Sequence, residues 1–175
     1  VKDCNAEFGL ADAQWLGHAI AVTGIVGDQQ ASAIGQACIE PNTIKSTYGT
    51  GCFVLMNTGE KQIVSEHHLL STVAFQISNH VTYAIEGSIF VAGAATGWLR
   101  QGLQLDDKIR DTQALAQSLS SNDGVYFVTA LSGLGAPYWQ PDARGVMVGL
   151  SLDTKVAHLV RAALEAVCYQ TKDLL

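Results

Sequence analysis

Two stretches of this sequence carry residues that could do chemistry, and the first is Gly27-Asp28-Gln29-Gln30. It follows a short apolar run and precedes a helix-like pattern, which places Asp28 at a strand end and a helix start. A carboxylate in such a position can accept a proton from a substrate hydroxyl. The alternative is that Asp28 is a helix N-cap, because Asp is among the residues preferred there. The capping box is absent, since Ala31 stands where Glu or Gln would complete it.

The second stretch is Thr47-Tyr48-Gly49-Thr50-Gly51-Cys52-Phe53, a β-branched and aromatic run broken by two glycines around a hydroxyl. Glycines at these positions leave backbone N–H groups free to approach a phosphate closely. The alternative is an ordinary bulge or hairpin turn. A base and a phosphate cradle are two of the parts that phosphoryl transfer requires, because the nucleophile must be oriented and the charge on the phosphate neutralised.

Four motifs, two of which lie in these stretches, closely resemble in their order and spacing the motifs of glycerol kinases, of the sugar-kinase family within the actin-like ATPase superfamily. The resemblance runs from about residue 17 to residue 175. It includes the C-terminal signature of the family, followed after a seven-residue spacer by His158-Leu159. The motifs are Gly27-Asp28-Gln29-Gln30, Tyr48-Gly49-Thr50-Gly51-Cys52-Phe53, Met56-Asn57-Thr58-Gly59-Glu60 and Gly133-Leu134-Gly135-Ala136-Pro137-Tyr138-Trp139, and the signature is Gly145-Val146-Met147-Val148-Gly149-Leu150.

The resemblance implies an activity and a substrate site. The expected reaction is ATP-dependent phosphorylation of glycerol to glycerol 3-phosphate, with Asp28 as general base and substrate ligand. Gln29 is expected to hydrogen-bond a glycerol hydroxyl, and Phe53 to line the carbon backbone of the substrate. Mg²⁺ is expected to bridge the phosphates and to reach Asp28 through water, so no residue of this chain is predicted as a direct metal ligand.

The resemblance also implies a nucleotide site for ATP and ADP. Gly49 and Thr50 are expected to meet the phosphates through backbone N–H groups and a hydroxyl, and Gly93 to lie beside the nucleotide. Glycine in a helix interior costs about 1 kcal/mol against alanine, so the glycines of residues 86–103 indicate close approach by a ligand or by another backbone. Gly97 departs from the family, in which Gln is usual, and one nucleotide contact is therefore expected to be missing.

The fold class implied is α/β, of the actin-like and ribonuclease H-like type, with a mixed sheet flanked by helices. Residues 1–38 are expected to be the C-terminal end of a first actin-like domain that carries the catalytic Asp. Residues 39–175 are expected to be most of a second, nucleotide-binding domain, with the site in the cleft between the two. Because glycerol kinases are much longer, we expect this chain to be a central fragment that does not turn over alone.

The hydrophobic pattern predicts the individual elements. The last helix has the clearest period, with Asp153 or Thr154 expected as its cap. The segment 43–85 is expected to form an antiparallel meander, with turns at 57–60 and 78–80. The expected strands are 19–26, 43–48, 52–56, 69–77, 81–85 and 125–129; the other expected helices are 29–39 (with Ala31, Ile34 and Cys38 on one face), 86–103 and 111–119; and residues 131–144 are expected to be a loop.

Composition narrows the class of protein. The net charge of −6 argues against nucleic-acid or anionic-membrane partners, which require clustered Lys and Arg. The four cysteines lack Cys-x-x-Cys spacing and the five histidines lack metal-ligand spacing, so a zinc ribbon, a disulfide framework and a transition-metal site are not expected. We expect a cytoplasmic protein without a membrane partner that forms homo-oligomers in its longer form.

Two questions stay open at this level. Tyr138 and Trp139 could stack on a ligand or could anchor their loop to the core. The function could instead be phosphorylation of a related sugar or polyol, with Asp28 retained and the pocket changed. The other alternative to glycerol phosphorylation is an inactive actin-like segment with only a structural role.

Overall fold

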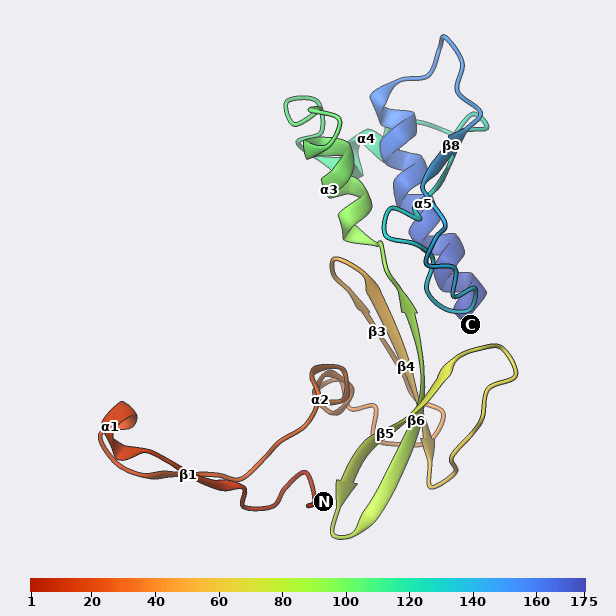
Figure 1. Ribbon diagram of the computed structural model, residues 1–175. Coiled ribbons are helices and arrows are strands. Elements are labelled where there is room, and N and C mark those ends of the chain that lie inside the picture. Colours follow the sequence, from red (N-terminus) through yellow and green to blue (C-terminus); the bar gives the residue numbers. More distant parts are fainter. The chain divides into compact units, whose positions relative to one another are not determined.

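The computed structural model describes residues 1–175, and its helices and strands are shown in Figure 1. The chain divides into two compact units. The first unit comprises Val1–Lys45 and Leu55–Glu86, and the second comprises Ser46–Val54 and Gly87–Leu175. Each unit is therefore built from segments that are distant in sequence. No helix is long and apolar enough to cross a membrane.

A four-stranded sheet contains β3 (Ile44–Tyr48), β4 (Cys52–Gly59), β5 (Leu70–Ile77) and β6 (His80–Ile89). Its strand order is β3-β4-β6-β5, so β6 lies between β4 and β5. The predicted meander is wrong in this respect, because a meander would place β5 next to β4. The inner position suits β6, whose last residues are buried, while β5 is more exposed along its length.

Strand β4 runs further than the sequence pattern predicts. Residues 57–59 belong to the strand and not to a turn, because Asn57 is fully buried with its side chain satisfied. Its amide nitrogen donates to the Cys38 carbonyl oxygen at 3.2 Å, and its amide oxygen accepts from the backbone N–H of Gly59 at 2.8 Å. A polar residue that reads as a turn former can occupy a buried strand when its hydrogen bonds are made.

The turn between β5 and β6 is a two-residue hairpin loop, as the antiparallel register pairs Ile77 with His80. Ser78 and Asn79 both have positive φ, 51° and 65°, which is typical of the type I′ turns that match strand twist. Beyond this turn β6 extends to Ile89, so the predicted helix 86–103 begins later. The observed helix is α3 (Gly93–Gln101).

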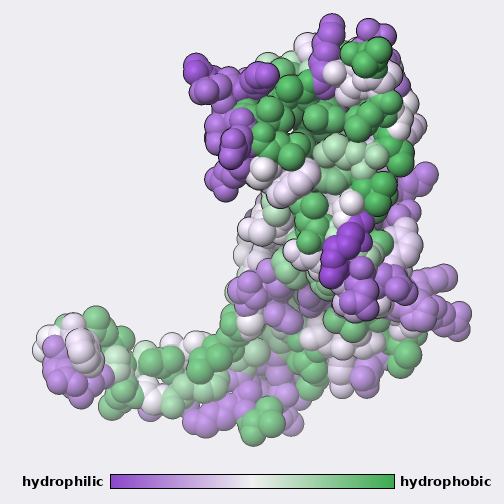
Figure 2. Space-filling model, turned by 45° about the horizontal axis from the view of Figure 1, so that its top comes forward, coloured by the Kyte–Doolittle hydropathy of each residue, from purple (hydrophilic) through white to green (hydrophobic).

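The N-terminal part of the first unit contains β1 (Gly9–Ala11), α1 (Ala13–Leu16) and β2 (Ile20–Val22), with β1 and β2 antiparallel. The predicted strand 19–26 is too long, because the backbone leaves the pair after Val22 and the N–H of Ile25 donates to the Cys4 carbonyl at 3.0 Å. Apolar surface of the kind that marks protein interfaces is exposed on the molecule (Figure 2). In this segment it comes from Leu10, Trp15, Leu16, Ile20 and Val22.

The core of the second unit is formed by α3, α4 (Thr112–Gln117), α5 (Val156–Leu174), β7 (Tyr126–Val128) and β8 (Val146–Val148). The fully buried side chains of this core include Leu99 on α3 and Val160 on α5. The predicted helix 111–119 and the predicted last helix are confirmed. The cap of α5 is Lys155, because Thr154 accepts instead from the backbone N–H of Ser151 at 2.8 Å.

A part-buried ion pair on α5 holds an arginine that also reaches the C-terminal end of α4. Arg161 Nε lies 2.7 Å from Glu165 Oε1, and each side chain is 26% exposed. The guanidinium also donates to the Leu119 carbonyl at 2.6 Å. It donates as well to the Ala116 carbonyl of α4 at 3.4 Å, so Arg161 satisfies carbonyls at a helix C-terminus and is more than one half of a solvated surface pair.

Candidate functional site

Asp28 is the first residue of α2 (Asp28–Gly35), and its side chain is exposed. The N-cap of α2 is Gly27, and no side chain caps the helix. The capping interpretation of Asp28 is therefore wrong, whereas its predicted place at a helix start is confirmed. Its predicted place at a strand end is wrong, because β2 ends at Val22. A carboxylate in the first turn is stabilised by the helix dipole. The group is ionisable, accessible and not used for capping.

Two further side chains are connected to this carboxylate by hydrogen bonds. The amide nitrogen of Gln29 donates to Asp28 Oδ2 at 3.1 Å. The amide oxygen of Gln29 accepts from the ammonium group of Lys45, which lies on β3 and is only 4% exposed. No motif in the sequence marks Lys45. Its only signal is a lysine within a strand pattern, where alternation by itself does not tell which face is buried.

Helix α2 is shorter than the predicted 29–39. It ends at Gly35, and the N–H of Cys38 closes the turn on the Ala33 carbonyl at 2.8 Å. Ala33 is the buried residue of the helix, while Ile34 is exposed, so the predicted apolar face is also wrong. Ala37, with a φ of 58°, breaks the helical path before Cys38.

The Gly49-Thr50-Gly51 segment is the loop between β3 and β4. The N–H of Gly49 donates to the Gly51 carbonyl at 2.8 Å. It is therefore not free to meet a phosphate, although the sequence predicts that it would be. Gly51 is required by close packing, since a Cβ there would lie 2.5 Å from the carbonyl oxygen of Ile89. The arrangement is the tight turn that was the alternative interpretation, and Thr50 lies exposed at its tip.

The start of α3 packs directly on this loop. The N–H groups of Ala92 and Ala94 donate to the Thr50 carbonyl at 2.8 and 3.1 Å, and that of Gly93 donates to the Gly49 carbonyl at 2.9 Å. A Cβ at Gly93 would lie 2.7 Å from the same Gly49 oxygen. Backbone packing therefore accounts for Gly93, and its nucleotide role stays a prediction.

The predicted site residues are divided between the two units. Asp28 and Gln29 belong to the first unit. The second unit contains Gly49, Thr50 and Gly93, together with Phe53, which is half-buried on β4.

The aromatic pair of the 131–144 loop is held by the protein itself. The Tyr138 hydroxyl donates to Asp173 on α5 at 2.5 Å, and this hydrogen bond to a carboxylate raises the pKa of Tyr138 above 10.0. The Trp139 ring meets Phe90 edge-on, with ring centroids 6.2 Å apart. These contacts support the anchoring interpretation of both residues.

Comparison with known families decides the kind of protein. The model of the C-terminal domain of the FGGY family of carbohydrate kinases matches residues 44–175. The chain belongs to this family. The resemblance to glycerol kinases is confirmed. This FGGY chain is 60% identical over 175 residues to a glycerol kinase of Marinomonas sp. (strain MWYL1). It is 55% identical over 175 residues to a glycerol kinase of Coxiella burnetii (strain RSA 493 / Nine Mile phase I). Both matches cover 100% of the chain and 35% of the relative.

The FGGY chain therefore spans about a third of the length of the curated relatives it matches. Its structure is similar to that of Plasmodium falciparum glycerol kinase with ADP, at a TM-score of 0.85 and 37% identity, covering 99% of this chain and 35% of that one. It is similar to xylulose kinase from Rhodospirillum rubrum at a TM-score of 0.73 and 23% identity, covering 98% and 35%. The predicted actin-like α/β fold of the sugar kinases is confirmed, while the boundary near residue 38 stays a prediction.

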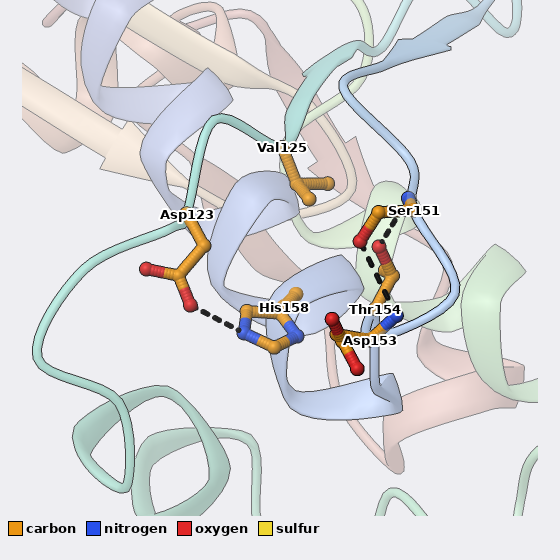
Figure 3. Close-up of a pocket in the computed structure, with 6 residues that line it drawn as sticks. All are labelled: Asp123, Val125, Ser151, Asp153, Thr154 and His158. Carbon is orange, nitrogen blue, oxygen red and sulfur yellow. Dashed lines mark hydrogen bonds and ion pairs between the residues drawn. The ribbon is translucent and has the colours of Figure 1, made fainter.

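A pocket in the second unit of the FGGY chain contains none of the predicted site residues (Figure 3). His158 is 5% exposed within it, and both of its ring nitrogens are engaged. Nδ1 accepts from the backbone N–H of Lys155 at 2.8 Å, and Nε2 lies 3.2 Å from Asp123 Oδ2. The ring thus has no free nitrogen to activate a nucleophile. The pocket is lined by Asp123, Val125, Ser151, Asp153, Thr154 and His158.

Asp123 is expected to make the stability of this region depend on pH. A hydrogen bond from Ser121 and one from His158 lower the pKa of Asp123 below 3.8. A carboxylate with a depressed pKa stabilises the fold above its unfolded pKa, and this contribution is lost as the pH falls through the folded pKa. Replacing Asp123 by Asn, which tolerates its φ of 50°, should lower the melting temperature at pH 7.

The check is a series of melting temperatures from pH 7 to pH 2. The difference between wild type and Asp123→Asn should shrink below about pH 3.8. Asp142→Asn, at an exposed position, is the matched control and should follow the wild type. A difference that stays constant over the whole range would contradict the assignment.

Proposed function

We propose that the protein carrying this sequence phosphorylates glycerol at the expense of ATP, forming glycerol 3-phosphate and ADP. The observation that carries the proposal is the Asp28 carboxylate, which is exposed at the start of α2, not used as a cap and held by the amide of Gln29. The similarity to glycerol kinases over all 175 residues of this chain supports glycerol as the substrate.

In this proposal Asp28 accepts the proton of a glycerol hydroxyl as the hydroxyl oxygen bonds to the γ-phosphorus. The bond from that phosphorus to the bridging oxygen breaks, and ADP leaves with its electron pair. Gln29 has a second N–H on the same amide nitrogen, which is available for a glycerol oxygen. Phe53 supplies an apolar face for the carbon backbone.

Thr50 is the residue that we propose for the nucleotide phosphates, because it is exposed at the tip of the β3–β4 loop and carries a hydroxyl. Gly49 would contribute by close backbone approach, since its N–H already donates to Gly51. An exposed carboxylate fits Mg²⁺, which keeps several waters and takes one or two carboxylates plus phosphate oxygens. Asp28 could hold this ion through water, and the ion would supply charge neutralisation at the phosphates.

The test is a coupled assay of ADP release by the full-length protein with glycerol, dihydroxyacetone, erythritol and xylulose as substrates. We expect the highest kcat/KM with glycerol and dependence on added Mg²⁺. Preference for another polyol would overturn the substrate assignment, and inactivity with all four would overturn the proposal.

A further inference from the structure

Lys45 is a buried lysine that the proposed reaction does not yet use. It lies on β3 and is 4% exposed, whereas its strand neighbour Ile44 is 48% exposed. Lysine is almost never fully buried unless its charge is paired or hydrogen-bonded. The usual burial is reversed here, because the lysine is buried and the isoleucine is exposed. This reversal indicates that the ammonium group has a specific role inside the first unit.

The ammonium group faces the amide of Gln29. Its Nζ donates to Gln29 Oε1, and Gln29 Nε2 in turn donates to Asp28 Oδ2 at 3.1 Å. Both contacts lie within the first unit, which contains all three residues. The three side chains form one directed chain of hydrogen bonds from a buried cation to an exposed carboxylate.

The chemistry of the groups determines this direction. An ammonium has only donors and an ionised carboxylate has only acceptors, whereas an amide has one end of each kind. With Lys45 at the oxygen end, the NH₂ end must face Asp28. Without Lys45 the oxygen end of the amide loses the donor that fixes it, and only the bond to Asp28 then orients the Gln29 side chain.

We propose that Lys45 is a positioning residue that acts through Gln29 on Asp28. It locks the amide in the orientation that holds the Asp28 carboxylate and leaves the second N–H of Gln29 for a substrate oxygen. The kinetic part of this inference rests on the proposed function, whereas the hydrogen-bond chain can be tested without turnover.

The kinetic test is a double-mutant cycle in the full-length protein with glycerol as substrate. Lys45→Met keeps the length of the side chain and removes the ammonium, and it should lower kcat/KM about tenfold, in line with loss of a charge-assisted hydrogen bond. In a Gln29→Ala background the same change should have less than about a twofold effect, because coupled residues are not additive. Lys61→Met, which removes an exposed lysine of the same unit, should match the wild type.

Full additivity of the two changes would overturn the proposal, because Lys45 would then not act through Gln29. A second measurement needs no activity. The ¹⁵N signal of the Lys45 ammonium should shift in Gln29→Ala and stay unchanged in Gln14→Ala, a glutamine on α1. Inactivity of the wild type together with this shift would remove the proposed function and retain the hydrogen-bond chain, whereas an unchanged ammonium signal in Gln29→Ala would overturn the chain itself.

Discussion

Replacing Asp28 by Asn should lower kcat for glycerol phosphorylation by about three orders of magnitude, within the range that general base catalysis contributes. The substitution is nearly isosteric, and the Asn oxygen can still accept the hydrogen bond from Gln29. It cannot accept the proton of the substrate hydroxyl. KM for glycerol and for ATP should therefore change little, and the steady-state constants of the full-length protein are the measurement.

A matched control is available at another helix start. Asp111 caps α4, with its Oδ1 accepting from the N–H of Ala114 at 2.9 Å. Asn is an equally good cap, so Asp111→Asn should keep the wild-type kcat and stability. If Asp28→Asn retained more than about a tenth of the wild-type kcat, the assignment of Asp28 as the base would be wrong.

Replacing Gly93 by Ala should damage the loop that we propose for the nucleotide. The new Cβ would lie 2.7 Å from the Gly49 carbonyl oxygen, a backbone atom that cannot move without shifting Gly49 and Thr50. Overpacking of this kind costs about 1–3 kcal/mol of folding free energy. We expect KM for ATP to rise about tenfold, equivalent to about 1.4 kcal/mol, with KM for glycerol much less affected.

Gly97→Ala is the control on the same helix. A Cβ at Gly97 meets nothing within 4 Å, and alanine is favoured over glycine in a helix interior by about 1 kcal/mol. This variant should therefore be slightly more stable than the wild type, and because alanine does not restore the missing amide its KM for ATP should change much less than that of Gly93→Ala. Equal KM values for ATP in the two variants would show that the contact between α3 and the Gly49-Thr50 loop does not matter for nucleotide binding. Thermal denaturation and initial-rate kinetics together separate the two effects.

Local signals in the sequence predicted what local physics controls. The helical period of residues 156–174 predicts α5 because burial of one stripe is set by residues three and four apart. Asn79 belongs to the residue types that tolerate positive φ, and the polar Ser78-Asn79 pair separates two strand-like runs, so the turn between β5 and β6 could be predicted. The order of the motifs indicated the family, and the change from an apolar run to a helix-like pattern placed Asp28 at a helix start.

The predictions that the structure contradicts share a different cause. Asn57 reads as a turn residue but lies inside β4, because a carbonyl from a distant part of the chain satisfies its amide. The N–H of Gly49 looked available for a phosphate, yet the Gly51 carbonyl takes it. In the sheet, β6 lies beside β4, where the sequence pattern predicts β5. Each outcome depends on a partner that the local pattern does not specify.

The sequence by itself thus determined the family, most of the elements and the place of Asp28 at the start of a helix, because propensity, periodicity and turn chemistry act over a few residues. Only the tertiary structure decided that Lys45 is buried against Gln29 and that Gly93 packs on the loop of Gly49. These features arise when strand pairing and close packing bring distant segments together. Burial of a charge and contact between two backbones are properties of that arrangement, and no local pattern encodes them.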